Sequence, residues 1–192
     1  MTIKDLVSRN RSYRRFNQEV DIKLDTLWEL VDLARLSASA ANMQPLRYIV
    51  CSDRDKNAAI FGCLAWAAYL KDWPGPAEGE RPAGYIIMLE DTGIAHPLHC
   101  DHGIAAQSIL LGATEKGLGG CIIGGINKPG LRNLLEIPEQ YEILLVLALG
   151  QPRESVVIEP LGPEGDVRYW RDENGVHHVP KRSLKDIVLR SL

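Results

Sequence analysis

The sequence has few cysteines, few aromatic residues and no long apolar run, and each shortage excludes a class of protein. Its four cysteines include no Cys-x-x-Cys pair, which argues against a disulfide scaffold. The most apolar stretch, residues 143–149, is far shorter than the roughly 20 residues of a transmembrane helix. The N-terminal residues carry an acidic side chain, Asp5, and no apolar stretch before their arginines, so no signal peptide is expected. We therefore expect a cytoplasmic protein with reduced thiols.

The residues that are present are typical of one globular domain. Of 192 residues, 45% are apolar and 24% are charged, which is enough apolar material to offset the entropy lost when the chain becomes ordered. The net charge of −3 argues against general binding to nucleic acid. No linker or low-complexity tract divides the chain, so we expect a single domain over residues 1–192.

Helix and strand patterns alternate along the chain and predict an α+β domain with a few central strands and flanking helices. Helical spacing of apolar residues predicts a helix over residues 26–36 with Asp25 as its N-cap. Asp53 is expected to cap a helix that continues to Ala68. Further helices are expected at residues 3–10, 99–116 and 131–137. Short apolar runs predict strands, the first of them buried, at residues 48–52, 85–90, 121–123 and 143–149.

Residues 150–180 are polar, rich in proline and poor in apolar side chains. A loop of this length is usually functional or packs on a partner subunit. The chain is then expected to close with a short helix or strand within residues 181–192.

Basic residues gather near both ends of the chain. Residues 9–15 contain four arginines, and no acid lies between Asp5 and Glu19. Lys181, Arg182 and Lys185 form a second group. A phosphate needs charge-assisted hydrogen bonds of the kind that these side chains make, so the two groups predict an anion site assembled in space. The alternative is that both groups are solvated surface charges.

Residues 117–125 (GLGGCIIGG) are the most glycine-dense stretch of the chain. Their spacing fits neither the G-x-G-x-x-G fingerprint of dinucleotide-binding folds nor a P-loop. The remaining interpretation is a backbone that runs close to a flat ligand and offers its N–H groups. Tight packing of a helix on a strand is the alternative for the same glycines.

Two other groups of residues suggest less specific sites. His99 and His102 have the i, i+3 spacing that can present two zinc ligands on a helix. No clear third ligand accompanies them, so a metal-dependent hydrolase is only an alternative. Trp66, Leu70 and Trp73 are near helical spacing and could line a flat pocket or pack in the core. No Gly-x-Ser-x-Gly motif is present.

Four segments together resemble the motifs of the nitroreductase family of FMN-dependent flavoproteins. Residues 11–16 (RSYRRF) resemble that family's opening motif R-R-S-x-R-x-F, and residues 39–45 (SAANMQP) resemble its P-S-x-x-N-x-Q-P motif. Residues 117–126 are similar to its G-L-G-x-x-x-G segment, and residues 181–184 (KRSL) to its basic closing motif. The four segments follow the family's order over nearly the whole chain. Asn10 and Ala38 stand where the family has Arg and Pro.

The resemblance implies a fold, a cofactor and a reaction. The fold is an α+β domain with a central, mostly antiparallel sheet flanked by helices, in an intertwined homodimer whose residues 151–192 reach over the partner subunit. The dimer binds FMN at two sites in its interface. It takes two electrons from NADH or NADPH and reduces nitro compounds, quinones or related acceptors. A flavin-binding protein that stores, senses or degrades FMN is the alternative.

The resemblance also implies which residues bind the cofactor. Because the flavin carries the redox chemistry, no catalytic acid, base or metal ion is expected of the chain. The phosphate and the ribityl chain are implied to contact Arg11, Ser12 and Arg14, and Lys181 and Arg182 are implied to close on the phosphate. The ribityl chain and the flavin ring are implied to lie along Ser39, Asn42 and Gln44. The N5 edge of the ring is implied to face the backbone of Gly124 and Gly125.

Overall fold

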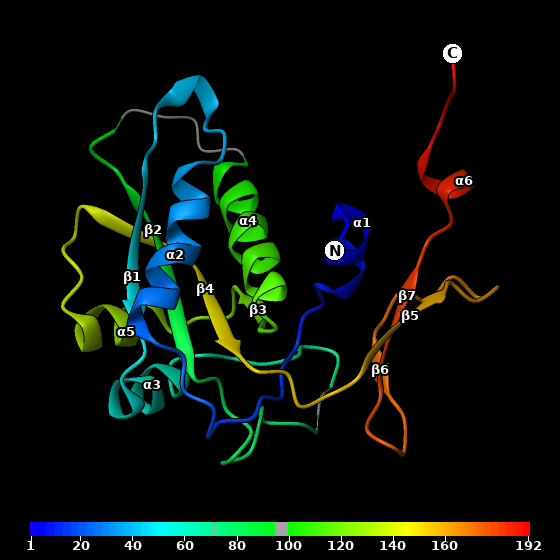
Figure 1. The fold of residues 1–192 in the computed structure, drawn as a ribbon, viewed down its shortest axis with the longest axis horizontal. Coiled ribbons are helices and arrows are strands. Elements are labelled where there is room, and N and C mark those ends of the chain that lie inside the picture. Colours follow the sequence, from blue (N-terminus) through cyan, green and yellow to red (C-terminus); the bar gives the residue numbers. More distant parts are fainter. Residues whose placement is uncertain (71, 95–99) are drawn as a thin grey trace.

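The central element of the structure is a four-stranded antiparallel sheet (Figure 1). The computed structural model describes residues 1–70, 72–94 and 100–192. The sheet has the order β1-β2-β4-β3, and every neighbouring pair is antiparallel. Its strands are β1 (Leu46–Cys51), β2 (Gly84–Asp91), β3 (Gly119–Ile123) and β4 (Tyr141–Gly150). The expected α+β class with an antiparallel sheet is confirmed.

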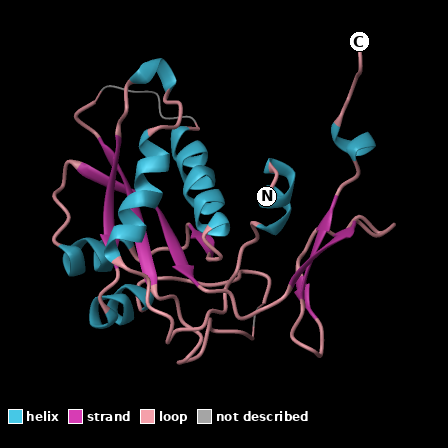
Figure 2. Cartoon of the chain, viewed as in Figure 1, coloured by secondary structure: helices cyan, strands magenta, loops and turns pink. Residues whose placement is uncertain are grey.

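Helices cover both faces of this sheet (Figure 2). They are α2 (Leu24–Arg35) and α4 (Asp101–Glu115) on one face, and α3 (Arg54–Phe61) and α5 (Lys128–Leu135) on the other. Successive residues of β2 alternate between the two core clusters. Ile86 and Met88 pack with α2 and α4, whereas Tyr85 and Ile87 pack with α3 and α5. Both faces of the strand are therefore buried, which explains its unbroken apolar sequence.

Local signals explain where most helices begin and end. The Asp53 side chain precedes α3 and accepts a hydrogen bond from the Lys56 N–H at 2.8 Å, as predicted. Gly117 follows α4 with φ of +75°, in the left-handed region that favours glycine. The prediction of Asp25 as an N-cap is wrong, because α2 begins at Leu24 and Asp25 lies in its first turn.

The predicted helix that runs to Ala68 is too long. α3 ends at Phe61, and the chain then turns towards the segment that follows β3. There the Ala65 N–H donates a hydrogen bond to the Gly125 carbonyl at 2.8 Å. This contact uses backbone groups that a longer helix would need, and it brings Trp66 beside the glycine segment.

The edge strand β1 differs from the buried strand predicted over residues 48–52. It begins at Leu46 and ends at Cys51, and its middle residues are only partly buried. The reason is its position at the edge of the sheet, since β2 is its one neighbouring strand among the described residues.

The C-terminal residues form a second, smaller sheet. We call residues 156–192 the arm and residues 1–155 the body. The arm contains β5 (Val156–Pro160), β6 (Trp170–Arg171), β7 (His177–Lys181) and α6 (Leu184–Ile187). β7 lies in the middle, parallel to β5 and antiparallel to β6, and the arm stands away from the main sheet (Figure 1). Residues 150–180 are therefore not the long loop that their composition suggests.

Apolar side chains of the arm and of the N-terminal helix are left exposed. α1 (Ile3–Arg9) buries none of its residues. In α6 and the residues after it, the exposed apolar side chains are Leu184, Ile187, Val188, Leu189 and Leu192. These surfaces have no cover within the described part of the chain.

Two further observations concern the class of protein. All four cysteines are free thiols, as expected. Within residues 1–70, 72–94 and 100–192, no helix has both the length and the apolar character needed to cross a membrane.

Candidate functional site

Basic residues from the two ends of the chain meet in one cavity, which we call the basic cavity. It has a volume of about 270 Å³ and lies between the N-terminal segment, α4, β3 and β7. Three of its lining residues, Arg11, Arg14 and Lys181, are cationic. In the described part of the chain, no carboxylate lies within ion-pairing distance of these three side chains, whereas the nearby Arg15 and Arg171 are both paired with glutamates. The cavity therefore carries unbalanced positive charge, which suits an anion.

Arg14 lies at the centre of this arrangement and is only 8% exposed. Its guanidinium stacks on the Tyr169 ring, 4.6 Å from the ring centroid, and its Nη1 donates to the Ser12 carbonyl at 3.3 Å. The same Nη1 lies 3.1 Å from Nε2 of His177. Pairing of this segment with β3, through a bridge between Ser12 and Gly120, fixes the backbone that carries Arg14. The guanidinium is thus held from several sides.

His177 is buried and uncharged. Its side chain is 1% exposed, and burial, reinforced by the charges of Arg14 and Arg171, lowers its pKa to about 4. Because an arginine only donates hydrogen bonds, Nε2 of His177 must accept from Arg14, and Nδ1 must carry the proton. That Nδ1 is buried and has no hydrogen-bond partner among the described residues. His177 therefore orients Arg14 without adding charge to the cavity.

The other predicted phosphate residues differ in their placement. Ser12 and Lys181 line the basic cavity, as does Asn10 at the position where the family has Arg. Arg11 is partly buried, which lowers its pKa, and its Nη2 donates to the Val7 carbonyl at 2.6 Å. Arg182 is exposed and lies outside the lining of this cavity.

A second cavity, which we call the glycine cavity, adjoins the basic cavity. It has a volume of about 310 Å³ and shares Arg14, Ile122 and Tyr169 with the basic cavity. Its remaining lining residues come from the turn after α3 and from β3 with the residues that follow it; they are Ala65, Trp66, Ala67, Ala68, Cys121, Ile123, Gly124 and Gly125. The two cavities are thus neighbours, one with a basic lining and one with a mostly small or apolar lining.

The two glycines of this cavity serve different purposes. Neither has a φ in the left-handed region, so backbone freedom is not what they provide. A Cβ added at Gly124 would meet nothing nearer than a Leu145 methyl carbon at 4.0 Å. A Cβ added at Gly125 would lie 3.1 Å from the Ala65 Cβ. Gly124 therefore leaves an open backbone, and Gly125 permits close packing.

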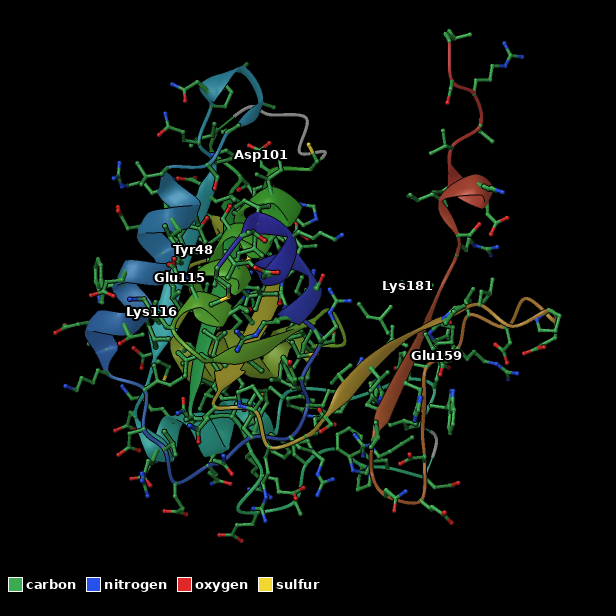
Figure 3. The ribbon with its side chains drawn as sticks, turned by 45° about the vertical axis from the view of Figure 1, so that its right-hand side comes forward. Tyr48, Asp101, Glu115, Lys116, Glu159 and Lys181 are labelled. Atoms are coloured by element: carbon green, nitrogen blue, oxygen red, sulfur yellow. The ribbon has the colours of Figure 1, made fainter. Side chains whose placement is uncertain are left out.

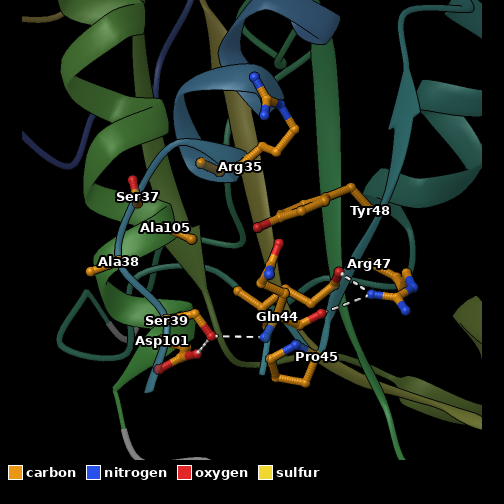
Figure 4. A pocket seen from close by; sticks show the side chains of 12 residues that line it. Arg35, Ser37, Ala38, Ser39, Gln44, Pro45, Arg47, Tyr48, Asp101 and Ala105 are labelled. Atoms are coloured by element: carbon orange, nitrogen blue, oxygen red, sulfur yellow. Dashed lines mark hydrogen bonds between the residues drawn. The ribbon is translucent and has the colours of Figure 1, made fainter. Parts of the chain in front are cut away.

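The second predicted motif lies elsewhere. Ser39 and Gln44 line a separate cavity of about 200 Å³, which we call the η1 cavity after the short helix η1 (Ala40–Asn42) (Figure 4). This cavity shares no lining residue with the basic or the glycine cavity. Asn42 is exposed and lines none of the three. Within one chain, the structure does not bring this motif together with Arg11 and Gly124.

Asp101 holds the second motif in place. Its carboxylate accepts a hydrogen bond from the Ser39 hydroxyl at 2.6 Å (Figure 4). It also accepts one from the Ala40 N–H at 3.1 Å. The Ser39 hydroxyl in turn accepts from the Gln44 N–H at 2.9 Å. Tyr48 points into the same cavity, and burial together with the Asp101 charge raises its pKa to about 12. Figure 3 shows Asp101 and Tyr48 on the body and Lys181 on the arm.

Sequence patterns do not reveal every residue of the site. Tyr169 and His177 give no motif signal, because they lie in the polar stretch whose strands were not predicted. Cys100 takes the N-cap position of α4, and Asp101, the first residue of that helix, fixes the Ser39 loop. His99 lies outside the described residues. Among those described, no three His, Cys, Asp or Glu side chains are grouped to hold a metal ion.

Comparison with known proteins identifies the family. The model of the nitroreductase family matches residues 7–151. A Methanothermobacter thermautotrophicus protein named NADH dehydrogenase/NAD(P)H nitroreductase is 27% identical over 161 residues, which cover 81% of this chain and 80% of that protein.

Solved structures share the fold. A nitroreductase family protein from Streptococcus pneumoniae TIGR4 aligns with a TM-score of 0.68 and 18% identity, over 85% of this chain and 96% of that one. An FMN-dependent nitroreductase from Clostridium difficile R20291 aligns with a TM-score of 0.66 and 21% identity, over 80% of this chain and 89% of that one. Because the family model spans most of the sequence, the chain belongs to the nitroreductase family.

Proposed function

We propose that the protein is an FMN-dependent oxidoreductase that takes two electrons from NADH or NADPH and reduces nitro compounds, quinones or related acceptors. One observation carries the proposal: Arg11, Arg14 and Lys181 line one cavity with no carboxylate within ion-pairing distance among the described residues, beside a cavity lined by the exposed Gly124. Membership of the nitroreductase family supports it.

The basic cavity fits the phosphate group of FMN. A phosphate carries close to two negative charges and accepts several hydrogen bonds, so it needs cations that are not already neutralised. Arg11 and Lys181 meet this requirement within the described chain, and the Ser12 hydroxyl adds a donor. Arg14, stacked on Tyr169 and bound to His177, adds positive charge from a fixed position.

The glycine cavity fits the flat ring system. Its walls are small or apolar apart from Arg14, and Gly124 leaves the backbone free to approach a ligand. When bound, FMN supplies the two-electron redox chemistry, and the protein supplies position and electrostatics. The side chain of Trp66 and the backbone after β3 limit the space for a donor or acceptor beside the ring.

We further propose that two copies of the chain complete each site. Ser39, Asn42 and Gln44 match a cofactor motif, yet they do not line the basic or glycine cavity of their own chain. Exposed apolar side chains, such as Trp28 at 63% and Leu189 at 93%, need cover. A homodimer in which the arm reaches over the partner supplies that cover and lets the Ser39 loop of one copy face the basic cavity of the other.

Titration of the apoprotein with FMN tests the cofactor. We expect tight binding that quenches flavin fluorescence, and an affinity at least about tenfold weaker for Arg11→Ala, because a hydrogen bond to a charged group is lost. The matched control is Arg9→Ala, since Arg9 is exposed and lies outside the cavity lining. Absence of binding, or equal loss in both variants, overturns the cofactor proposal.

Two further measurements test the reaction and the assembly. Oxidation of NADH or NADPH by the FMN-loaded protein should depend on a nitroaromatic or a benzoquinone acceptor. FMN binding without turnover of any acceptor points instead to a protein that stores, senses or degrades flavin. Sedimentation should give one species of twice the chain mass, and a monomer that retains FMN contradicts the shared site.

A further inference from the structure

A fourth cavity lies beside the proposed flavin site and has a single lining residue from the four motifs, Arg15. We call it the arginine–aromatic cavity. Its volume of about 540 Å³ is within the range of small-molecule sites and exceeds the volumes of the three cavities above. Its lining residues come from α3, from the turn before β2 and from both chain ends; they are Arg15, Phe61, Trp73, Pro74, Gly75, Pro76, Ala77, Glu80, Arg81 and Arg171.

The charge of this lining is positive. It contains three arginines and one carboxylate, Glu80. Arg15 binds that carboxylate through Nε at 2.7 Å and through Nη2, and Arg171 binds Glu154 at 2.9 Å. Arg81 has no carboxylate within ion-pairing distance in the ranges that the structure describes. Positive charge therefore remains in the cavity after the internal pairs are formed.

Aromatic rings orient two of these guanidinium groups. Arg81 lies over the Phe61 ring at 4.4 Å from its centroid, and Arg171 lies over the Trp73 ring at 4.8 Å. Stacking uses the flat face of a guanidinium and leaves N–H groups at its edge, which is the edge that binds a phosphate in bidentate fashion. The ring edges and the neighbouring Pro74 and Pro76 add apolar lining beside the guanidinium groups. Guanidinium edges beside aromatic surfaces form a site suited to a nucleoside phosphate.

A rigid wall separates this cavity from the glycine cavity. Trp66 lines the glycine cavity, and its ring centroid is 5.7 Å from that of Phe61, which lines the arginine–aromatic cavity. Gly75 has φ of +116°, and a Cβ added there would lie 2.8 Å from Trp66 Cδ1. Prolines on both sides of Gly75 restrict the backbone further. A ligand that spans both cavities would pass around the edge of Trp66.

We infer that the arginine–aromatic cavity binds the adenosine phosphate part of the nicotinamide dinucleotide donor, while its nicotinamide enters the glycine cavity. This inference rests on the proposed function. The phosphate of FMN has its own cations in the basic cavity, so the second basic site calls for a second phosphate-bearing ligand. A free nucleotide has the same chemistry as this half of the donor, and the experiment distinguishes the two sources.

Calorimetric titration with ADP tests the site without any turnover. The FMN-loaded protein should bind ADP, and Arg81→Ala should bind it about tenfold or more weakly, as expected for loss of a hydrogen bond to a charged group. Arg81→Lys, which keeps the charge without the planar edge, should recover part of the affinity. The matched control is Arg168→Ala on the arm, because Arg168 is exposed and its partner is Asp166. No ADP binding, or equal binding by Arg81→Ala and the wild type, overturns the site.

Kinetics with two donors identify the source. Arg81→Ala should raise KM for the reduced dinucleotide about tenfold and leave kcat near the parental value. KM for reduced nicotinamide mononucleotide, which lacks the adenosine phosphate, should not change, and ADP should compete with the dinucleotide only. ADP binding that depends on Arg81 with an unchanged KM for the dinucleotide assigns the cavity to a free nucleotide and overturns the donor inference. Oxidation of neither donor contradicts the proposed function, while the ADP titration still decides the nucleoside phosphate site.

Discussion

The body and the arm are stabilised in different ways. In the body, the β2 side chains from Tyr85 to Met88 are completely buried among apolar neighbours on both faces. In the arm, Ile158 and Leu189 are exposed. Its contacts with the body include hydrogen bonds to Glu154 and between Arg14 and His177, and ring contacts such as that of Tyr169 with Tyr69. The body therefore folds around its own core, whereas the arm is attached by hydrogen bonds and ring contacts and leaves apolar side chains exposed.

The junction between the two regions is built on one buried carboxylate. The Glu154 side chain is 1% exposed and accepts hydrogen bonds from Arg171 Nη2 at 2.9 Å and from the backbone N–H groups of Arg14 and Arg15. It thereby links β6 of the arm to the segment that carries the basic cavity. The attachment of the arm and the shape of the proposed cofactor site share the same hydrogen bonds.

The largest expected effect on stability is the difference between an isoleucine-to-alanine substitution in the body and one in the arm. Ile87→Ala in β2 should lower the free energy of unfolding by about 3–4 kcal/mol, because it leaves a cavity in a fully buried core. Ile158→Ala in β5 should cost less than about 1 kcal/mol, because Ile158 is 44% exposed. Urea unfolding of both variants is the measurement. Equal losses would show that the arm is buried by a partner as tightly as the body is buried by itself, and would break the contrast.

Loss of the junction charge should have a somewhat smaller effect. Glu154→Gln should cost about 2–3 kcal/mol, because the buried amide cannot pair with the Arg171 guanidinium as the buried carboxylate does. We also expect faster proteolysis within the arm than within the body. Asp166→Asn is the control, since its exposed pair with Arg168 should contribute little. Unchanged proteolysis in Glu154→Gln would mean that other contacts hold the arm.

Two adjacent histidines make the arm sensitive to pH in opposite directions. The pKa of His177 falls from 6.5 to about 4 on folding, so the unfolded chain binds more protons between these values. Stability should therefore decrease by up to about 1 kcal/mol for each pH unit as the pH falls from 6.5 towards 4. For His178, burial lowers the pKa, but hydrogen bonds to Glu159 and Asp172 outweigh it and raise the pKa. Its contribution is present at low pH and is lost as the pH rises through its folded pKa.

Melting curves across this pH range separate the two histidines. His177→Gln keeps an acceptor for Arg14 but cannot be protonated, so its melting temperature should fall less than that of the wild type between pH 6.5 and 5. His178→Gln should retain the acid-side loss and lose part of the stability at low pH. Parallel profiles for His177→Gln and the wild type would show that His177 does not limit the acid stability of the arm.

The sequence predicts the body better than the arm for a physical reason. β2 and β4 each contain a continuous apolar run that is easily recognised in the sequence. By contrast, β6 has two residues, and β7 contains two histidines and a proline. The short strands of the arm depend on pairing with one another and on Glu154, which local pattern does not reveal. The expectation of a cytoplasmic location stays a prediction.

The sequence also predicts some parts of the candidate site better than others. Arg11 and Lys181 were predicted to meet and do line one cavity, because each cluster has an unusual local composition. The role of His177 depends on a contact with Arg14, which is 163 residues away in the sequence, so no local pattern reveals it. Ser39 was predicted beside the same cofactor, but within one chain it lines a different cavity. A single sequence shows which motifs are present and not which of them meet in space.

The smallest expected effect on stability is at Gly124, which belongs to the body but is exposed like the arm. Gly124→Ala should change the free energy of unfolding by less than about 0.5 kcal/mol, because its new Cβ meets nothing nearer than 4.0 Å. It should nevertheless weaken FMN binding about tenfold if the ring lies against this backbone, since one methyl group then occupies the contact. Gly125→Ala is the matched control: its Cβ would lie 3.1 Å from the Ala65 Cβ, so it should lower stability by about 1 kcal/mol. Melting temperature and FMN affinity measured on the same samples distinguish a ligand contact from a packing contact. Normal FMN affinity in Gly124→Ala would place the ring away from this backbone, and the cationic cluster at Arg11 and Lys181 would then be the remaining structural support for the cofactor site.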